Sequence, residues 1–530
     1  MTRKIFSYFR NVIALFVIFV VLVIPNRLSD IYPDSFFHFP LEFLLLGLLL
    51  LIPGSVGKVF RWLAASVLAV GLIFKIADMA TFNIFARPFN PIFDAYLLVN
   101  GMNLLNGAVG KVAALLIVAM LVVVSLAIIV LAFFLMERVR KLLITRHKAS
   151  VISLLVLVSI WAVLWLVNSP RLSTQFYDQL AMHVINTRNS INDMRDFERL
   201  LVHSDEAKIP EQGLFQVLQG KDVLIIFIES YGRTALDKPE FSGHIRPLLQ
   251  MQSEKLQAAG ISVRSAYLTS PTVGGLSWLA HGTAMSGLWV NSQVRYDSLV
   301  MSKQPSLNKL FHHAGWRAVG VMPAITMAWP EGDYYGYDHL YHAYNSGYEG
   351  KPFNWITMPD QFTLSAFQRN ELEPDNRSPV MAEIALISSH APWTPVPELV
   401  DWNQIGNGEI FNEQATRGDS PESVWKNPER IRLQFRLSIE YTLQTVVDYV
   451  LKYGDENLVV MAFGDHQPAP LVTGDSDNRD VPVHFFTRDP KILDAIAGWR
   501  WAEGMVPADT GPVWTMDQVR ERFITTFSTP

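Results

Sequence analysis

The sequence predicts two parts of different fold class: an α-helical membrane domain with about five transmembrane helices, then an α/β domain whose central sheet is mostly parallel. Three observations lead to this prediction. Half of the 530 residues are hydrophobic and the mean hydropathy is +0.20, which is high for a soluble enzyme. Long apolar stretches precede residue 170. Beyond residue 220, short apolar runs alternate with helical or Gly/Pro-rich stretches, as in α/β proteins.

Five apolar stretches are the candidate membrane spans: about 12–25, 39–53, 62–76, 112–135 and 151–167. Only the fourth reaches on its own the ~20 apolar residues that a spanning helix needs, so the others borrow flanking residues. No small-residue cleavage site follows the first stretch, so we expect a retained helix and not a signal peptide. The Phe- and Pro-rich segment 82–98 is expected to lie at the membrane interface.

Basic residues in the short loops predict the orientation of these spans. They gather before the first span, in the second loop and in the fourth loop (Arg3, Lys4, Arg10; Lys58, Arg61; Arg138, Arg140, Lys141, Arg146, Lys148). Lys and Arg favour the cytoplasmic side. The N-terminus is therefore expected inside and, after an odd number of spans, everything beyond Asn168 outside.

Three segments follow from this organisation: a transmembrane domain over 1–168, connector helices over 169–219 with a helical stretch at 179–201, and an α/β domain over 220–530. The apolar runs expected to form strands of the last segment are 223–228, 318–322, 381–387, 458–463 and 481–486.

Charge and cysteine content exclude several functions. A net charge of -5 and a pI near 6.2 give no general attraction to nucleic acid, so none is expected as a partner. The chain has no cysteine, which excludes disulfides, thiolate metal sites and cysteine nucleophiles.

Acidic residues and histidines follow three of the predicted strands. Glu229 comes after 223–228, His390 after 381–387, and Asp465 and His466 after 458–463. Sheets of this class bind ligands at the carboxyl ends of their strands, and carboxylates with imidazole suit Zn²⁺ or Mn²⁺. The simpler alternative is that the acids cap helices and the histidines serve loops. Each residue alone fits that alternative, whereas their combination favours a metal site.

Ser277 is the candidate nucleophile. Gly274 and Gly275 interrupt any regular element, and a helix is expected from Ser277 onward. At a helix N-terminus, free backbone N–H groups favour an anion and an ionising hydroxyl. The alternative is that Ser277 only caps this helix.

These motifs, in this order, resemble the alkaline phosphatase–sulfatase superfamily. Within it they resemble membrane-anchored transferases such as lipoteichoic acid synthase, phosphoethanolamine transferase and phosphoglycerol transferase. The matching pieces are Ile228-Glu-Ser-Tyr-Gly232, Ser277, His390 to Trp393 (His-Ala-Pro-Trp) and Gly464-Asp-His466. The resemblance covers about 222–488 and the five-span layout. It implies one or two divalent ions, Zn or Mn, held by Glu229, Asp465, His466 and Ser277. It also implies a multi-pass protein of a bacterial-type inner (cell) membrane with a periplasmic catalytic domain.

Spacing around the nucleophile separates branches of this superfamily. Sulfatases carry Pro two residues and Arg four residues after the nucleophile, where this chain has Leu279 and His281. Thr272, an earlier hydroxyl, does not fit the spacing. In sulfatases this Pro and Arg mark a nucleophile that is oxidised to formylglycine, the aldehyde that suits them to sulfate esters. This chain lacks both residues, and an unmodified Ser277 fits phosphoryl transfer better. A membrane-bound sulfatase or phosphodiesterase and an inactive scaffold are the alternatives.

The resemblance implies a metal-dependent transferase that moves phosphoethanolamine or phosphoglycerol from a membrane phospholipid to an extracytoplasmic glycan or lipid through phosphoserine. His390 is the candidate to hold the phosphate or protonate the leaving oxygen, with His281 assisting. Trp393 is a further candidate for substrate binding.

Trp329 and Glu331 are the residues that indicate which head group is transferred. Lipoteichoic acid synthases have an Arg two residues after a Trp at a similar place, and Glu331 stands there in this chain. If Glu331 lines the pocket, it would repel an anionic group and pair with an ammonium, and Trp329 would offer its face to the same cation. Ethanolamine is then favoured over glycerol. The alternative is that Glu331 is a solvated loop carboxylate.

Overall fold

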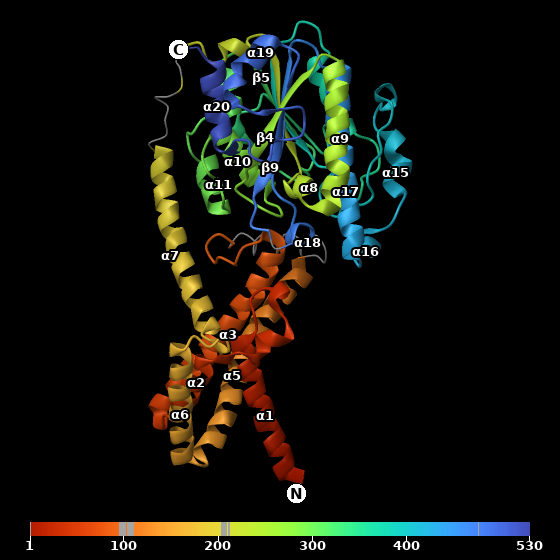
Figure 1. Cartoon of the computed structure of the whole chain (residues 1–530). Coiled ribbons are helices and arrows are strands. Elements are labelled where there is room, and N and C mark those ends of the chain that lie inside the picture. The colour runs from red at the N-terminus through yellow and green to blue at the C-terminus, as the bar shows by residue number, and fades with distance from the viewer. Residues whose placement is uncertain are drawn as a thin grey trace. The chain divides into compact units, whose positions relative to one another are not determined.

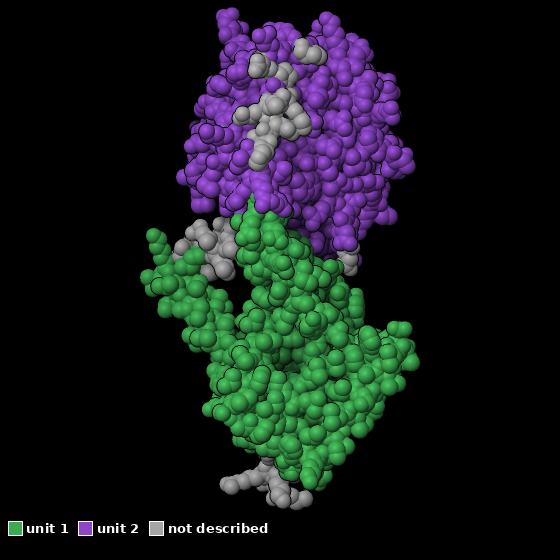
Figure 2. All heavy atoms as spheres, turned by 90° about the vertical axis from the view of Figure 1, so that its left-hand side faces the viewer, with its two compact units in different colours: residues 1–83, 87–195 green, residues 84–86, 196–530 purple. Residues whose placement is uncertain are grey.

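The computed structural model describes residues 2–94, 102, 111–202, 209, 212–474 and 476–529, with side chains from residue 9 onward. The chain forms two compact units (Figure 2). The first holds residues 1–83 and 87–195, and the second holds 84–86 and 196–530.

The first unit is helical (Figure 1). Its helices are α1 (Thr2–Val23), α2 (Leu41–Leu50), α3 (Gly54–Phe85), α5 (Lys111–Ile144), α6 (His147–Leu166) and α7 (Gln175–Val202), of which α7 continues into the second unit. Two short strands, β1 (Phe39–Pro40) and β2 (Leu172–Ser173), pair in parallel. The helix predicted at 179–201 is therefore confirmed as part of α7.

Three helices of this unit, α3, α5 and α6, are long and apolar enough to cross a membrane. The apolar part of α1 (Phe9–Val23) and α2 are shorter. Most apolar side chains of α5 and α6 are exposed, and such surfaces in a folded protein mark contact with other apolar matter, here lipid. The helical membrane domain is confirmed, and the count of five spans stays a prediction.

The segment 82–98, predicted to be interfacial, begins inside α3, which continues to Phe85. Residues 86–94 follow without regular helix or strand, and 95–98 lie outside the described residues.

The second unit is built on a nine-stranded sheet in the order β10-β4-β9-β8-β3-β7-β5-β6, with β11 paired to β4. The strands are β3 (Asp222–Ile228), β4 (Ser262–Thr269), β5 (Arg317–Met322), β6 (His339–His342), β7 (Val380–Leu386), β8 (Leu458–Gly464), β9 (Asp480–Thr487), β10 (Ala502–Glu503) and β11 (Val513–Thr515). The central strands β8, β3, β7, β5 and β6 are parallel, whereas β9 runs antiparallel to β8 and β4. All five predicted strands are confirmed.

Helices cover both faces of this sheet (Figure 1). On one side lie α9 (Pro239–Ala258) and α17 (Pro428–Tyr453), and on the other α10 (Ser277–Ser286), α11 (Gln293–Val300) and α20 (Gln518–Phe527). The other helices are α8 (Thr234–Asp237), α12 (Leu307–His313), α13 (Gly332–Tyr335), α14 (Asp360–Phe367), α15 (Asn412–Thr416), α16 (Pro421–Val424), α18 (Pro470–Thr473) and α19 (Pro490–Ala495).

Successive side chains of β3 pack alternately into the cores on the two faces of the sheet. Leu224 and Ile226 belong to the core cluster with α9 and α17, while Val223 and Ile225 belong to the cluster with α10 and α20. Because successive side chains of a strand point to opposite faces, a strand covered on both sides is apolar on both. All seven residues of β3 are buried, and the six after Asp222 are apolar. The register brings the carboxyl ends of β3 and β8 together, since Ile228 pairs with Gly464.

Candidate active site

Glu229, Asp465 and His466 meet where β3 and β8 end. One ligand atom from each lies within 4.8 Å of the others, and all three residues are buried. His466 Nε2 lies 3.3 Å from Glu229 Oε1 and 3.6 Å from Asp465 Oδ2. Their proximity follows from the strand pairing, because Glu229 and Asp465 are the first residues after two neighbouring parallel strands.

Backbone groups fix the orientation of Asp465. Its Oδ1 accepts hydrogen bonds from the backbone N–H groups of Ser230 (2.8 Å) and His466 (2.7 Å). Ser230 has a left-handed backbone with φ 58°, which is uncommon for a residue with a side chain and concentrates at functional sites. The second oxygen, Oδ2, remains to face His466.

A backbone carbonyl orients the ring of His466. Its Nδ1 lies 2.8 Å from the carbonyl oxygen of Gln467, which accepts the Nδ1 hydrogen. Nε2 is therefore the nitrogen left to bind a cation, the arrangement common among histidine ligands.

Ser277 is the first residue of α10, as predicted. Its Oγ donates to Glu229 Oε2 at 3.0 Å and lies 3.2 Å from His466 Nε2. Leu276 before it adopts a left-handed conformation, φ 65°, which turns the chain from the glycine pair into the helix. The hydroxyl thus lies beside the three charged side chains at a helix N-terminus, where a negative charge is favoured.

Burial and mutual charge shift the pKa values of all three groups. Burial opposes the charge on Glu229, but the charges of His390 and His466 outweigh burial and hold the pKa of Glu229 below its ordinary value. Burial and the neighbouring Glu229 raise the pKa of Asp465 to about 7. Burial lowers the pKa of His466, but Asp465 and Glu229 outweigh it and raise that pKa to about 9.

This residue set fits a divalent metal. Two carboxylates, an imidazole and a hydroxyl are ligands that Zn²⁺ and Mn²⁺ accept. Within the described part of the chain, neither Glu229 nor Asp465 has an ion pair with Lys or Arg. Buried charges need compensation, and a divalent cation would provide it.

His281 lies on α10 one helical turn beyond Ser277 and is held by a residue that the sequence did not reveal. Its Nδ1 is 2.7 Å from Glu383 Oε1, and its ring stacks on Phe227 with 3.7 Å between centroids. Glu383, in the middle of β7, also accepts from Asn308 (2.6 Å) and Tyr337 (2.8 Å). A carboxylate within an otherwise apolar buried strand was the available signal for this network.

His390 follows β7 on the same side of the sheet and is half-buried. Its ring stacks on Trp355, with 4.4 Å between centroids and 16° between planes, and its charge acts on Glu229. Trp393, three residues on, is 3% exposed, donates to the carbonyl of Ser389 at 2.7 Å, and stacks on Trp425. Trp393 therefore packs in the interior, and its contact with substrate stays a prediction.

Trp329 and Glu331 lie before α13. Trp329 packs on Tyr335, with 5.5 Å between centroids, and Glu331 is half-buried and acts electrostatically on Tyr296. Within the described residues, no hydrogen bond or ion pair joins Trp329, Glu331 or Trp393 to Ser277 or to the three candidate metal ligands.

Comparison with known proteins gives structural similarity alone. No protein-family model matches the chain. No curated protein matches its sequence. Similar solved structures include the lipoteichoic acid synthase LtaP from Listeria monocytogenes (13% identity, TM-score 0.37, 62% of this chain and 76% of that one). They also include the zinc complex of the C-terminal periplasmic domain of EcEptC from Escherichia coli (13%, 0.38, 58% and 82%). A third is the Streptococcus pyogenes phosphoglycerol transferase GacH with sn-glycerol-1-phosphate (11%, 0.37, 64% and 91%).

Proposed function

We propose that this chain is a membrane-bound phosphotransferase that moves a phospho-head group from a phospholipid to an extracytoplasmic glycan or lipid through a phosphoserine at residue 277. The single observation that carries the proposal is the position of the Ser277 hydroxyl. It lies within 3.0 Å of Glu229 and 3.2 Å of His466, so a nucleophile and the candidate metal ligands share one site.

In the first half-reaction, Ser277 Oγ bonds to the phosphorus of the phosphodiester, and the bond from phosphorus to the diacylglycerol oxygen breaks. The hydroxyl hydrogen points to Glu229 Oε2 in the resting site and leaves in that direction. His390, beside this site, donates a proton to the departing diacylglycerol oxygen. In the second half, the oxygen of an acceptor hydroxyl bonds to the phosphorus and the bond from phosphorus to Ser277 Oγ breaks. The acceptor's proton passes to His390, and Ser277 Oγ regains the proton that it gave toward Glu229.

Glu229, Asp465, His466 and Ser277 would hold the divalent cation. When bound, Zn²⁺ or Mn²⁺ in such a site lowers the pKa of a serine hydroxyl and offsets negative charge on phosphoryl oxygens. The chain itself orients the ligand atoms. Two backbone N–H groups fix Asp465, and the Gln467 carbonyl fixes His466, so the ligand atoms are preorganised.

The head group is proposed to be phosphoethanolamine. Glu331 and Trp329 together offer an anion and an aromatic face to an ammonium group, and Glu331 would repel the extra charge of an anionic donor. Glu331 is half-buried at the start of α13, which fits a carboxylate with one side open to a ligand.

A liposome experiment tests both proposals. The full-length protein is reconstituted with phosphatidylethanolamine or phosphatidylglycerol, each labelled in the head group, and diacylglycerol and transferred label are measured. Diacylglycerol should appear with wild type and not with Ser277→Ala, and ethanolamine label should move in preference to glycerol label. Wild-type turnover by Ser277→Ala would reject the nucleophile. Transfer from phosphatidylglycerol alone, unchanged by Glu331→Ala, would replace the ethanolamine assignment with glycerol phosphate.

A further inference from the structure

The first unit carries a cleft of ≈ 590 Å³ that lies between α7 and Phe74 of α3. Six of its lining residues form one stripe along α7: Val184, Thr187, Arg188, Ile191, Asn192 and Arg195. Their spacing of three and four residues places them on one face of the helix. The stripe therefore combines two apolar, two polar and two cationic side chains in a single groove.

Arg188 and Arg195 make this groove cationic. Both are exposed, and neither forms a hydrogen bond or ion pair with the described part of the chain. None of the described residues that line the cleft is acidic. A guanidinium presents several donors that match phosphate oxygens, and two helical turns separate the arginines by about 10 Å, so both can reach one phospholipid head group.

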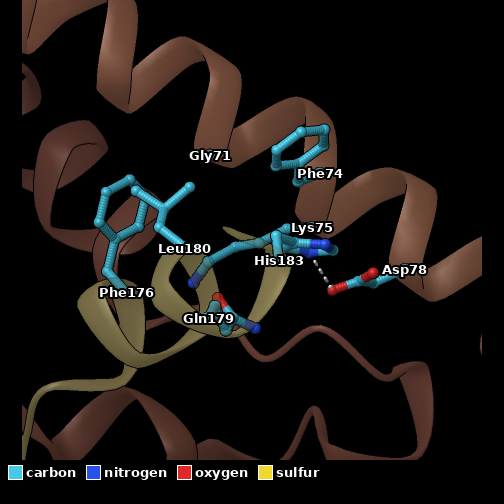
Figure 3. A pocket seen from close by; sticks show the side chains of 8 residues that line it. All are labelled: Gly71, Phe74, Lys75, Asp78, Phe176, Gln179, Leu180 and His183. Atoms are coloured by element: carbon cyan, nitrogen blue, oxygen red, sulfur yellow. Dashed lines mark hydrogen bonds and ion pairs between the residues drawn. The ribbon is translucent and has the colours of Figure 1, made fainter. Parts of the chain in front are cut away.

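His183, which also lines the cleft, gives a second, independent sign of a ligand. Figure 3 shows its side chain beside Phe74 and Asp78. The side chain is 5% exposed, its ring lies 4.6 Å from Phe74, and its Nε2 is 3.1 Å from Asp78 Oδ2. Its other nitrogen, Nδ1, is buried and has no hydrogen-bond partner within the described residues. A buried polar atom without a partner is unfavourable, and His183 is one of the residues that line the cleft.

The charged neighbours of His183 are already engaged. Lys75, seen beside it in Figure 3, donates to the carbonyl oxygens of Leu22 (3.2 Å) and Ile24 (2.5 Å) at the end of α1. Asp78 also accepts from the backbone N–H of Phe89 at 2.9 Å. These contacts tie α3 to its surroundings, and they leave the arginines of α7 as the groups available to an anion.

We infer that this cleft binds an anionic phospholipid of the extracytoplasmic leaflet. The phosphodiester would lie against Arg188 and Arg195, and the glycerol and upper acyl carbons against Phe74, Val184 and Ile191. Phe74 belongs to a helix long and apolar enough to span the membrane, so lipid is the phosphate source at hand. Binding of this lipid depends neither on the transfer reaction nor on the donor head group of the proposed function.

Binding is measured on the full-length protein in a neutral detergent by calorimetric titration with short-chain phosphatidylglycerol. Arg188→Gln/Arg195→Gln should weaken binding about tenfold or more, since it removes both guanidinium groups that would make charge-assisted hydrogen bonds to the phosphodiester. The matched control Lys111→Gln/Arg171→Gln removes two cations elsewhere in the same unit and should bind as wild type does. An unchanged gel-filtration profile establishes that each variant is folded.

The arms of the experiment separate the alternatives. Ser277→Ala should bind the lipid with wild-type affinity, so a failed transfer reaction does not affect this test. Equal affinity of wild type and Arg188→Gln/Arg195→Gln would overturn the inference. Inorganic phosphate or glycerol phosphate competing as well as the lipid would also overturn it, because the cleft would then be a site for free anions.

Discussion

Among single residues, burial determines what the titratable side chains of the second unit can do. Asp465 and His466 are buried beside each other with Glu229, and their pKa values rise to about 7 and about 9. His484 is buried without a charged partner, and burial lowers its pKa to about 3. Glu229, Asp465 and His466 can release protons when a metal ion binds, whereas His484 is held neutral.

His484 makes the stability of the fold depend on pH. Its Nδ1 is 2.8 Å from Ser265 Oγ and its Nε2 is 3.1 Å from Tyr231 Oη. Because its pKa falls from 6.5 to about 3 on folding, the unfolded chain binds the proton first. The stabilisation is complete above pH 6.5 and is lost as the pH falls. This residue should remove about 2 kcal/mol from the free energy of unfolding between pH 7 and pH 5.

Urea unfolding of the full-length protein in detergent, followed by tryptophan fluorescence at both pH values, measures this loss. His484→Gln should lose about 2 kcal/mol less than wild type between pH 7 and pH 5, while the exposed control His244→Gln should behave as wild type. The same pH dependence in wild type and His484→Gln would show that the residue is not held neutral.

Glu383 is an acceptor shared by three side chains from separate segments of the chain. It binds His281 of α10, Asn308 of α12 and Tyr337. Glu383→Leu would leave His281 and Asn308, both buried, and Tyr337, half-buried, without this acceptor, and should lower the free energy of unfolding by about 3 kcal/mol or more. The matched control Ile384→Leu in the same strand should cost less than ~1.5 kcal/mol. In a double-mutant cycle, His281→Ala should add less in the Glu383→Leu background than in wild type. Additive losses would contradict the network.

The candidate metal ligands and Ser277, which lie at element ends, were predicted from the sequence, whereas the network around Glu383, inside a strand, was not. Glu229, Ser277 and Asp465 follow strands or begin a helix, so the chain pattern alone placed them at one edge of the sheet. Glu383 stands inside a strand, and its partners lie between 46 and 102 residues away in the sequence. No local pattern records such a contact, because packing of α10 and α12 on the sheet creates it.

At the scale of elements, strand patterning explains which strands were found. The central parallel strands are buried on both faces and read as continuous apolar runs. β4 was missed because Ser262–Thr269 mixes polar and apolar residues, as befits a strand nearer the sheet edge. β6 is only four residues long, too short for a periodic signal.

Close packing between β8 and the segment after β3 positions the site. A Cβ at Gly464 would lie 1.9 Å from the carbonyl oxygen of Tyr231, so Gly464→Ala must push apart the two segments that carry Glu229 and Asp465. Zinc affinity of the full-length protein should fall about tenfold or more, the loss expected when ligand support is disturbed. The exposed control Gly243→Ala has open space around its Cβ and should keep wild-type affinity. Undiminished zinc affinity in Gly464→Ala would contradict this account of the site.

At the scale of the whole molecule, the helical membrane part and the α/β part were both predictable, because each has its own hydropathy pattern. The count of five spans stays a prediction: α3, α5 and α6 are long and apolar enough to cross a membrane, and among the described residues the apolar helices Phe9–Val23 and Leu41–Leu50 are shorter. Whether they cross depends on packing against other helices, which a hydropathy pattern does not encode.

The orientation of the molecule is tested by fusions. Loop charges place the C-terminus outside and the turn between α5 and α6, residues 145–146, inside. A reporter that is active only outside the cytoplasm should give signal at the C-terminus and none when inserted at 145–146. The reverse pattern would show that the predicted topology is inverted. Ser277 would then lie on the other side of the membrane from the one that the proposal requires.

The central claim is that Ser277 carries the phospho-head group between donor and acceptor. The most direct measurement is mass spectrometry of the Ser277 peptide after the full-length protein, in liposomes with zinc or manganese, is quenched in acid during turnover. We expect the mass of phosphoethanolamine on Ser277 in wild type, its loss with chelator, and no adduct in Ser277→Ala. Turnover of phospholipid by wild type with an unmodified Ser277 peptide, or with the adduct on another residue, would contradict the account.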